Sequence, residues 1–126
     1  MIISVHITDG PLDDIPPAFT IAGAGALVRF DGIVRPTENG VSIAGLEYEI
    51  YQPMAEKLLR QLAEELGHRR GLLGMSIEHS RGTVRVGECS FRLRVASSHR
   101  AEALAAMGEF IDRLKSDVPI WKQVLR

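Results

Sequence analysis

Alternating hydrophobic and polar residues predict most of the strands of this chain. Successive side chains of a strand point to opposite faces, so a period of two marks a strand with one buried face. Strands are predicted over residues 2–8, 24–34, 41–50, 72–78, 82–86 and 88–97. The Asn39-Gly40 pair favours a tight hairpin, which makes 41–50 the return strand of 24–34.

Two other stretches have the longer period of an amphipathic helix. In residues 53–67, Met54, Leu58, Leu62 and Leu66 recur every four residues, Ala55 and Leu59 widen the stripe, and Gly67 is expected to end the helix. The second helix runs to about Lys115, with Ser97 or Ser98 as its N-cap. Its expected buried stripe is Ala103, Ala106, Met107, Phe110, Ile111 and Leu114. The order of elements predicts one α+β domain over residues 1–126, with mainly antiparallel strands and two main helices.

Composition favours a compact protein without a membrane segment. The chain has 126 residues, of which 45% are hydrophobic and 25% charged, as in ordinary globular domains. No apolar run approaches the ~20 residues that cross a bilayer, and the N-terminus reads as a strand rather than a signal peptide. The single cysteine, Cys89, excludes an internal disulfide and is expected to be buried. We therefore expect a cytoplasmic protein with no membrane contact.

The charge is distributed unevenly along the chain. Residues 1–67 hold 4 basic against 10 acidic side chains, a balance of −6, and residues 68–126 hold 11 against 6, a balance of +5. Solvated strand and helix faces would explain most of these arginines. A pI of about 6.4, without zinc-ligand spacing or an aromatic RNA-binding platform, argues against a nucleic-acid partner.

Arginine and histidine stand at two positions that favour anions. Arg35 closes the predicted strand 24–34, where a guanidinium could pair with a phosphate, although Arg35 taken alone is better explained as a plain surface arginine. His99 and Arg100 begin the second helix, whose N-terminus already attracts anions. An anionic ligand would offset these added cations, and the alternative is an ion pair of Arg100 with Glu102 or another carboxylate.

Two lysines lie seven residues apart on either side of the end of the second helix. Lys115 is in its last turn, and Lys122 follows Trp121, which could anchor the segment in an apolar groove. A lysine near other cations can act as a nucleophile or general base. Residues 99 to 115 of a helix span roughly 24 Å at ~1.5 Å per residue. Arg100 and Lys115 therefore belong to different sites, or a second protomer brings its Arg100 beside Lys115.

The remaining polar residues give weaker signals. His79 lacks an acidic partner at a catalytic spacing, and His6 and His68 are expected at the surface. No cluster of cysteine, histidine and carboxylate has metal-ligand spacing, so we expect no metal.

Five motifs together resemble the MoaE family, the catalytic (large) subunits of molybdopterin synthase. They are Phe30-x-Gly32-x-Val34-Arg35, Leu46-x-Tyr48-Glu49-x-Tyr51 followed by Met54-Ala55, Gly82-x-Val84-x-Val86-Gly87-Glu88, Ser98-His99-Arg100, and Asp112-x-Leu114-Lys115-x-x-x-Pro119-Ile120-Trp121-Lys122. They occur in the family's order over about residues 20–122. Each motif alone is weak, and their joint order is specific.

The resemblance implies an α+β fold with an α/β hammerhead-type element and a sulfurtransferase activity. Such an enzyme converts cyclic pyranopterin monophosphate (precursor Z) into molybdopterin, in molybdenum cofactor biosynthesis. The sulfur donor is the thiocarboxylate on the C-terminal Gly-Gly of a small MoaD-type subunit, so no cofactor is expected. Two large subunits form a central homodimer, with a small subunit at each end of the heterotetramer.

The resemblance also implies roles for six residues. Lys115 and Lys122 match the active-site lysines. Arg35, His99 and Arg100 match positions that bind the phosphate and pterin of the substrate, and Phe30 matches an aromatic that lines the pocket.

Three departures from the family pattern bear on these roles. Gln123 to Arg126 replace the usual basic residue and glutamate after Trp-Lys, so a contribution from a longer tail would be missing. His79-Ser80-Arg81 replaces an adjacent His-Arg, and Ile111 stands where some relatives have methionine.

Two other functions are weighed against the synthase. A binding module would dock the tail of a ubiquitin-like protein without chemistry. A dimer that binds phosphate ligands for an unrelated purpose would ignore a thiocarboxylated partner. The presence of both lysines favours the synthase.

Overall fold

The computed structural model describes residues 1–126 as one sheet with two helices and a small hairpin. The strands are β1 (Ile2–Asp9), β2 (Ala26–Ile33), β3 (Thr37–Glu38), β4 (Val41–Ser42), β5 (Gly45–Ile50), β6 (Gly74–Arg85), β7 (Cys89–Ser97) and β8 (Ile120–Leu125), and the helices are α1 (Met54–Arg70) and α2 (Arg100–Asp117). The two helices and the mainly antiparallel strands confirm the α+β prediction.

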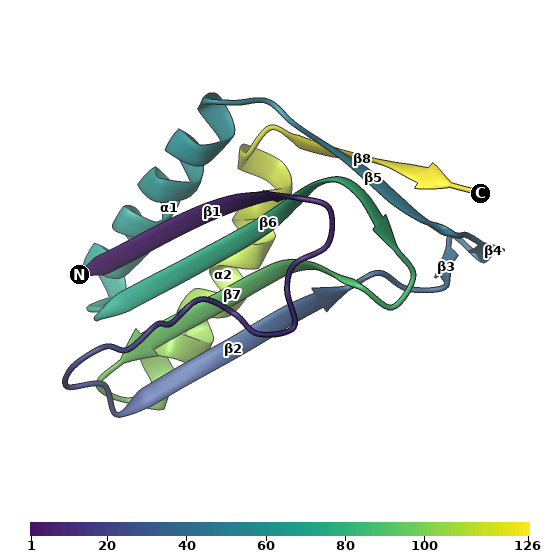
Figure 1. Ribbon diagram of the computed structural model, residues 1–126. Helices are drawn as coiled ribbons and strands as arrows, with labels where there is room; N and C mark the ends of the chain where they lie inside the picture. The colour runs from purple at the N-terminus through teal and green to yellow at the C-terminus, as the bar shows by residue number, and fades with distance from the viewer.

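The main sheet has the strand order β2-β7-β6-β5-β8, and β1 lies parallel beside β6. Both helices cover one face of the sheet, and the segment between β1 and β2 crosses the other face (Figure 1). The β5–β8 pair and the β3–β4 hairpin extend away from the helices toward the C-terminus (Figure 1). The hairpin leads into β5 and α2 leads into β8, so both connect to the same pair of outer strands.

The hydrophobic core lies between the helices and the sheet. Strand residues of alternating position, such as Ile77, Leu93 and Val95, are fully buried there. On α1 the buried stripe is Ala55, Leu59, Leu62, Ala63 and Leu66. All of these except Ala63 belong to the predicted stripe, whose first residue, Met54, was wrong because it is 45% exposed. On α2 the predicted stripe is confirmed from Ala103 to Phe110, whereas Ile111 and Leu114 are only partly buried.

The predicted pairing of 24–34 with 41–50 was wrong. Asn39 and Gly40 do turn the chain, with φ of 50° and 78°, but the hairpin they close joins only β3 to β4. The segment 41–50 is divided into β4 and β5, and β5 pairs with β6 and β8, while β2 pairs with β7. Both edges of β5 are thus occupied by distant parts of the chain, which local turn chemistry does not reveal.

The two strands predicted over 72–78 and 82–86 are one long strand, β6. Its partner changes at Gly82: residues up to Arg81 pair with β1, and Gly82 to Arg85 pair with β5. Gly82 has a φ of 86°, which non-glycine residues rarely adopt. Gly82 therefore marks a change of partner and not a chain break.

The helix ends differ from the prediction. Gly67 is buried inside α1, where a Cβ would meet the Met1 sulfur at 2.1 Å, and Gly71 ends the helix with a left-handed φ of 66°. The N-cap of α2 is His99 without a side-chain cap, and the Ser97 hydroxyl instead donates to the His99 carbonyl. Neither helix has the combination of length and apolar composition that crossing a membrane requires.

Arg92 and Arg94 are buried, so solvated strand faces, the plain explanation considered for the arginines, do not account for these two. They extend from β7 toward the segment between β1 and β2, where Arg92 donates to the Asp13 carbonyl at 2.7 Å and Arg94 to the Pro17 carbonyl at 2.8 Å. Arg92 also forms ion pairs with Asp31 (3.0 Å) and Glu78 (3.2 Å). These contacts fix the segment to the sheet.

Candidate active site

A cavity of about 570 Å³ lies where the ends of β2 and α2 meet β5 and β8. It is lined by residues from three separate stretches of the chain, 30–48, 79–91 and 111–122: Phe30, Gly32, Ile33, Val34, Arg35, Glu38, Leu46, Tyr48, His79, Ser90, Phe91, Ile111, Leu114, Lys115, Ile120, Trp121 and Lys122. Four of the six residues singled out in the sequence are among them: Phe30, Arg35, Lys115 and Lys122. The cavity combines apolar walls with three cations.

Each lysine is positioned by a different element. Lys115 is in the last turn of α2, and Lys122 lies on β8, opposite Tyr48 of β5. The chain reverses direction between them, because the Ile120 amide donates to the Val118 carbonyl at 2.8 Å. This turn brings both lysines to one cavity, although they are seven residues apart in the sequence. Trp121 also lines this cavity, although 57% of its side chain remains exposed.

One carboxylate, that of Glu38, lies among the cations. Lys122 Nζ donates to Glu38 Oε1 at 3.3 Å, and Arg35 Nη2 is 3.7 Å from the same oxygen. The hydrogen bond from Lys122 and its charge hold the pKa of Glu38 below its ordinary value. Lys115 has no ion-pair partner in the cavity. Three cations thus face one anion.

The floor of the cavity is polar but uncharged. The Tyr48 hydroxyl and the Ser90 hydroxyl are 3.0 Å apart, and the ring of His79 packs edge-on against Tyr48 with centroids 5.1 Å apart. His79 Nδ1 donates to the Ser80 carbonyl at 2.8 Å, since a carbonyl can only accept. Burial lowers the pKa of His79, so its ring is neutral at neutral pH.

Aromatic rings close the side of the cavity next to β2. The Phe30 and Phe91 rings are tilted by 55° with centroids 6.1 Å apart, and Phe91 also contacts His79 at 5.8 Å. Phe30 remains 39% exposed, so its ring forms a wall and not part of the core. A flat or apolar portion of a ligand could pack here, with its anionic group at the lysines.

His99 and Arg100 are outside this cavity. They begin α2, about 22 Å from Lys115 at ~1.5 Å per residue, and both are exposed. Arg100 forms no ion pair with Glu102, whose Oε2 is buried without a hydrogen-bond partner. Within one chain the six candidate residues therefore form two groups, as the length of the helix predicts.

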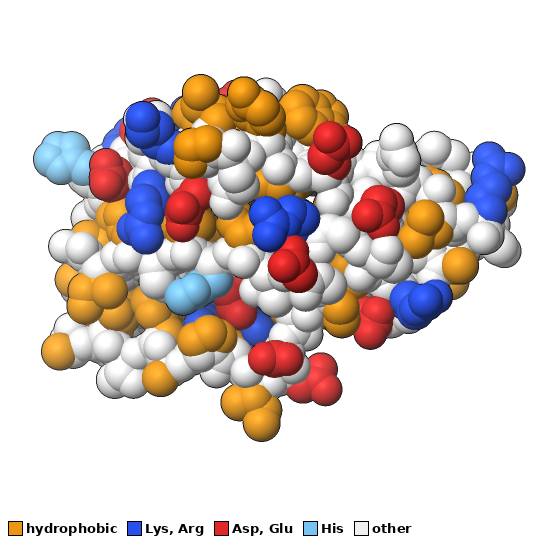
Figure 2. All heavy atoms as spheres, turned by 45° about the horizontal axis from the view of Figure 1, so that its top comes forward, with side chains coloured by type: hydrophobic (Ala, Val, Ile, Leu, Met, Phe, Trp, Pro, Cys, Tyr) orange, Lys and Arg blue, Asp and Glu red, His pale blue; other side chains and the backbone are white.

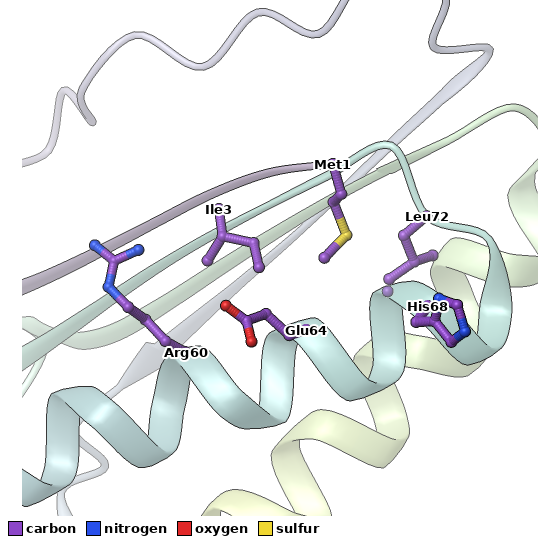
Figure 3. Close-up of a pocket in the computed structure, with 7 residues that line it drawn as sticks. Met1, Ile3, Arg60, Glu64, His68 and Leu72 are labelled. Atoms are coloured by element: carbon purple, nitrogen blue, oxygen red, sulfur yellow. The ribbon is translucent and has the colours of Figure 1, made fainter.

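On the face shown in Figure 2, acidic and basic side chains are interspersed among hydrophobic ones. A second cavity, of about 600 Å³, lies between the start of β1 and α1, where Arg60, Glu64 and His68 of the helix face Met1 and Ile3 (Figure 3). It shares no residue with the lysine cavity. No group of three or more potential ligand side chains is placed to hold a metal ion.

Sequence reasoning missed four polar residues of the cavity: Glu38, Tyr48, His79 and Ser90, the last of which was only part of a predicted strand. Glu38 was treated only as part of a turn, Tyr48 only as a strand and motif position, and His79 was set aside for want of an acidic partner. His79 continues the alternation of Met75 and Ile77 on the buried face, which could have marked it as an inward-facing polar residue. Nothing local marks Glu38, because its partner Lys122 is 84 residues away.

Comparison with known proteins gives consistent matches over most of the chain. The sequence model of the MoaE protein family matches residues 11–117. A molybdopterin synthase catalytic subunit of Staphylococcus carnosus is 41% identical over 99 residues, which are 79% of this chain and 66% of that relative's own length.

Two solved structures extend the match to nearly the whole fold. A crystal structure of molybdopterin synthase from Staphylococcus aureus covers 95% of this chain and 89% of its own, with a TM-score of 0.83 and 34% identity. A Helicobacter pylori complex of subunits 1 and 2 of molybdopterin-converting factor covers 95% of this chain and 83% of its own, with a TM-score of 0.72 and 29% identity. The chain belongs to the MoaE protein family.

Proposed function

We propose that this protein is the catalytic subunit of a molybdopterin synthase. It transfers sulfur from the thiocarboxylate of a small MoaD-type subunit to cyclic pyranopterin monophosphate, and so forms the dithiolene of molybdopterin. The observation that carries the proposal is the cavity itself: Lys115, Lys122, Arg35 and Phe30 come together there in a chain of the MoaE family. The S. carnosus relative described above is a molybdopterin synthase catalytic subunit.

The charge of the cavity suits both reactants. A cyclic phosphate and an acyl thiocarboxylate are anions, and preorganised cations stabilise such groups most where water is partly excluded. Arg35 is the planar donor that a phosphate prefers. Lys115, without a carboxylate partner, is the group free to exchange protons or to contact the acyl carbon of the donor. Since the sulfur comes from a protein thiocarboxylate, the proposed reaction needs no cofactor.

The partner in this proposal is a small subunit with a C-terminal Gly-Gly. Support comes from the H. pylori structure, which is a complex of two subunits of molybdopterin-converting factor. A narrow Gly-Gly tail can enter a cavity whose mouth is lined by exposed Lys122 and Trp121.

A turnover assay tests the proposal. The protein is mixed with the cyclic pyranopterin and a thiocarboxylated MoaD-type subunit, and molybdopterin is measured as its fluorescent oxidised derivative. Lys115→Ala should lower the rate by about 10²- to 10⁴-fold, the range for a group that moves protons in the transition state. Lys57→Ala is the matched control, because Lys57 is an exposed lysine on α1 outside the cavity.

Equal turnover in Lys115→Ala would refute the assigned role. If the wild type binds the small subunit without forming product, the domain is a binding module. If it binds cyclic phosphates and ignores the small subunit, it is a phosphate-binding protein of another purpose.

A homodimer would complete the site with His99 and Arg100 from the second protomer, and two small subunits would make it a heterotetramer. A mixing experiment tests this arrangement. Lys115→Ala and Arg100→Ala are each expected to be inactive alone, and mixed protomers should regain about a quarter of wild-type activity, since half the dimers are mixed and each has one intact site. No recovery after verified exchange would show that the two groups of residues serve separate sites.

A further inference from the structure

Glu38 is the one acidic side chain that lines the lysine cavity. Its Oε1 accepts a hydrogen bond from Lys122 at 3.3 Å and lies 3.7 Å from Arg35 Nη2. The Glu38 side chain is only 17% exposed, whereas those of Lys122 and Arg35 are 52% and 74% exposed. The carboxylate therefore lies on the inner side of the two cations, and the cations face the solvent.

The β3–β4 hairpin holds this carboxylate in place. Glu38 pairs with Val41 across the turn, and the Ile43 amide donates to the Pro36 carbonyl at 3.0 Å. Lys122 approaches from β8, which is held to β5 by pairing along its full length. The contact between them thus joins two elements that are built independently of it.

The charges at this end of the cavity leave room for a ligand anion. Arg35, Lys115 and Lys122 supply three positive charges against the single carboxylate of Glu38. The pKa of Glu38 lies below its ordinary value because of its hydrogen bond to Lys122, so the carboxylate is ionised at neutral pH. An anion that enters meets two cations already shared with Glu38 and is repelled by the carboxylate itself.

We propose that Glu38 is a built-in competitor for the anion site formed by Arg35 and Lys122. It keeps the two cations in place while the cavity is empty, and the anionic group of the ligand takes over their hydrogen bonds. Glu38 thereby weakens binding of all anions and determines which ligands bind tightly enough to compete. The proposal rests on the proposed function for the identity of the ligand, whose anionic group is either a phosphate or the terminal carboxylate or thiocarboxylate of a protein tail.

Calorimetric titration of Glu38→Gln tests the proposal without turnover. One arm uses inorganic phosphate, and the other uses a short peptide that ends in Gly-Gly with a free carboxylate, with its C-terminal amide for comparison. The amide side chain of glutamine keeps the size of Glu38 and removes its charge. Glu38→Gln should lower the Kd of the anions by about two- to fivefold, the range for one charge interaction at a partly exposed site. A lower Kd in only one arm identifies which anion uses the site.

Two further variants control the measurement. Glu64→Gln removes one negative charge from the exposed face of α1, inside the second cavity, and should leave both Kd values unchanged. Glu38→Asp keeps the charge on a shorter side chain and should stay closer to the wild type than Glu38→Gln does.

An equal or higher Kd for Glu38→Gln in both arms, with unchanged thermal unfolding, would overturn the proposal. If Glu38→Gln fails to fold, Glu38→Ala, which also removes the charge, takes its place: a lower Kd in either arm supports the proposal, and an equal or higher Kd in both arms overturns it. Turnover provides the distinction from the proposed function. A lower Kd for Glu38→Gln in a protein that makes no molybdopterin would support the competitor role of Glu38 and refute the proposed synthase function. An active enzyme whose Kd is unchanged by Glu38→Gln would support the synthase function and refute the competitor role.

Discussion

Two groups of charged residues lie near one another in this fold, and their charges are arranged in opposite ways. Under the segment between β1 and β2, the buried Arg92 and Arg94 lie with the buried Glu78 and the partly exposed Asp31, two cations with two anions. In the lysine cavity, Arg35, Lys115 and Lys122 face only Glu38, and the cations are exposed.

The difference follows from the cost of burying charge. A buried ion must be paired and hydrogen-bonded, because removal from water costs several kcal/mol per ion. Arg92 meets this condition with two carboxylates and the Asp13 carbonyl. Lys115 can remain without a carboxylate because it is exposed. A balanced, buried cluster therefore indicates structure, and an unbalanced, open one indicates a ligand.

The largest expected effect is on the buried cluster. Arg92→Met keeps much of the side-chain volume but leaves Glu78 buried without its closest partner, so it should lower the free energy of unfolding by about 3–5 kcal/mol. Urea unfolding measures this loss. Adding Glu78→Gln should recover part of it, because the unpaired charge is then removed. A loss below about 1 kcal/mol would mean that the cluster behaves like surface ion pairs.

In the cavity, a comparable substitution should affect activity and spare stability. Lys122→Met should slow molybdopterin formation by about 10²-fold or more and change the free energy of unfolding by less than about 0.5 kcal/mol. Turnover and urea unfolding of one preparation provide both numbers. Lys57→Met is the control for loss of an exposed lysine. A stability loss as large as that of Arg92→Met would erase the distinction between the two groups.

The neutral floor of the cavity gives a pH-dependent effect. Burial lowers the pKa of His79 in the folded state, so below its unfolded value of about 6.5 the unfolded chain binds more protons. Stability from His79 is present above that pH and falls as the pH drops through it, by up to about 1.4 kcal/mol per unit. His79→Phe should remove this slope, and His68→Gln, at an exposed position, should leave it. Unfolding free energies measured at pH 5, 6 and 7 test this prediction. If the pH slope of His79→Phe equals that of the wild type, His79 on the cavity floor is not held neutral by folding.

The smallest effect is expected at the edge of the buried cluster. Arg29 pairs with Asp31 at 2.9 Å, but its side chain is 43% exposed, so Arg29→Gln should cost less than about 1 kcal/mol. Burial raises the pKa of Asp31, but the hydrogen bonds from Arg29 and Arg92 outweigh this and hold it below its ordinary value. The carboxylate therefore keeps a partner when Arg29 is removed. A loss close to that of Arg92→Met would extend the cooperative cluster to the surface.

Predictability from the sequence differed between local and distant features. The period of Leu59, Leu62 and Leu66 and the alternation of Leu93 and Val95 reflect burial on one face, which the sequence records directly, so the helices and strands were found. The pairing of β5 with β8 and the unity of β6 were missed, because backbone pairing across long loops leaves no local pattern.

The amino-acid sequence by itself determined the α+β class, the two helices, the Asn39-Gly40 turn and the motifs of the MoaE family. Those features depend on side-chain periodicity, turn chemistry and residue identity, all of which are local. Only the tertiary structure decided that Arg92 is buried with Glu78, and that Glu38 contacts Lys122. The sign and burial of a charge's neighbours determine its role, and folding brings those neighbours together from distant parts of the chain.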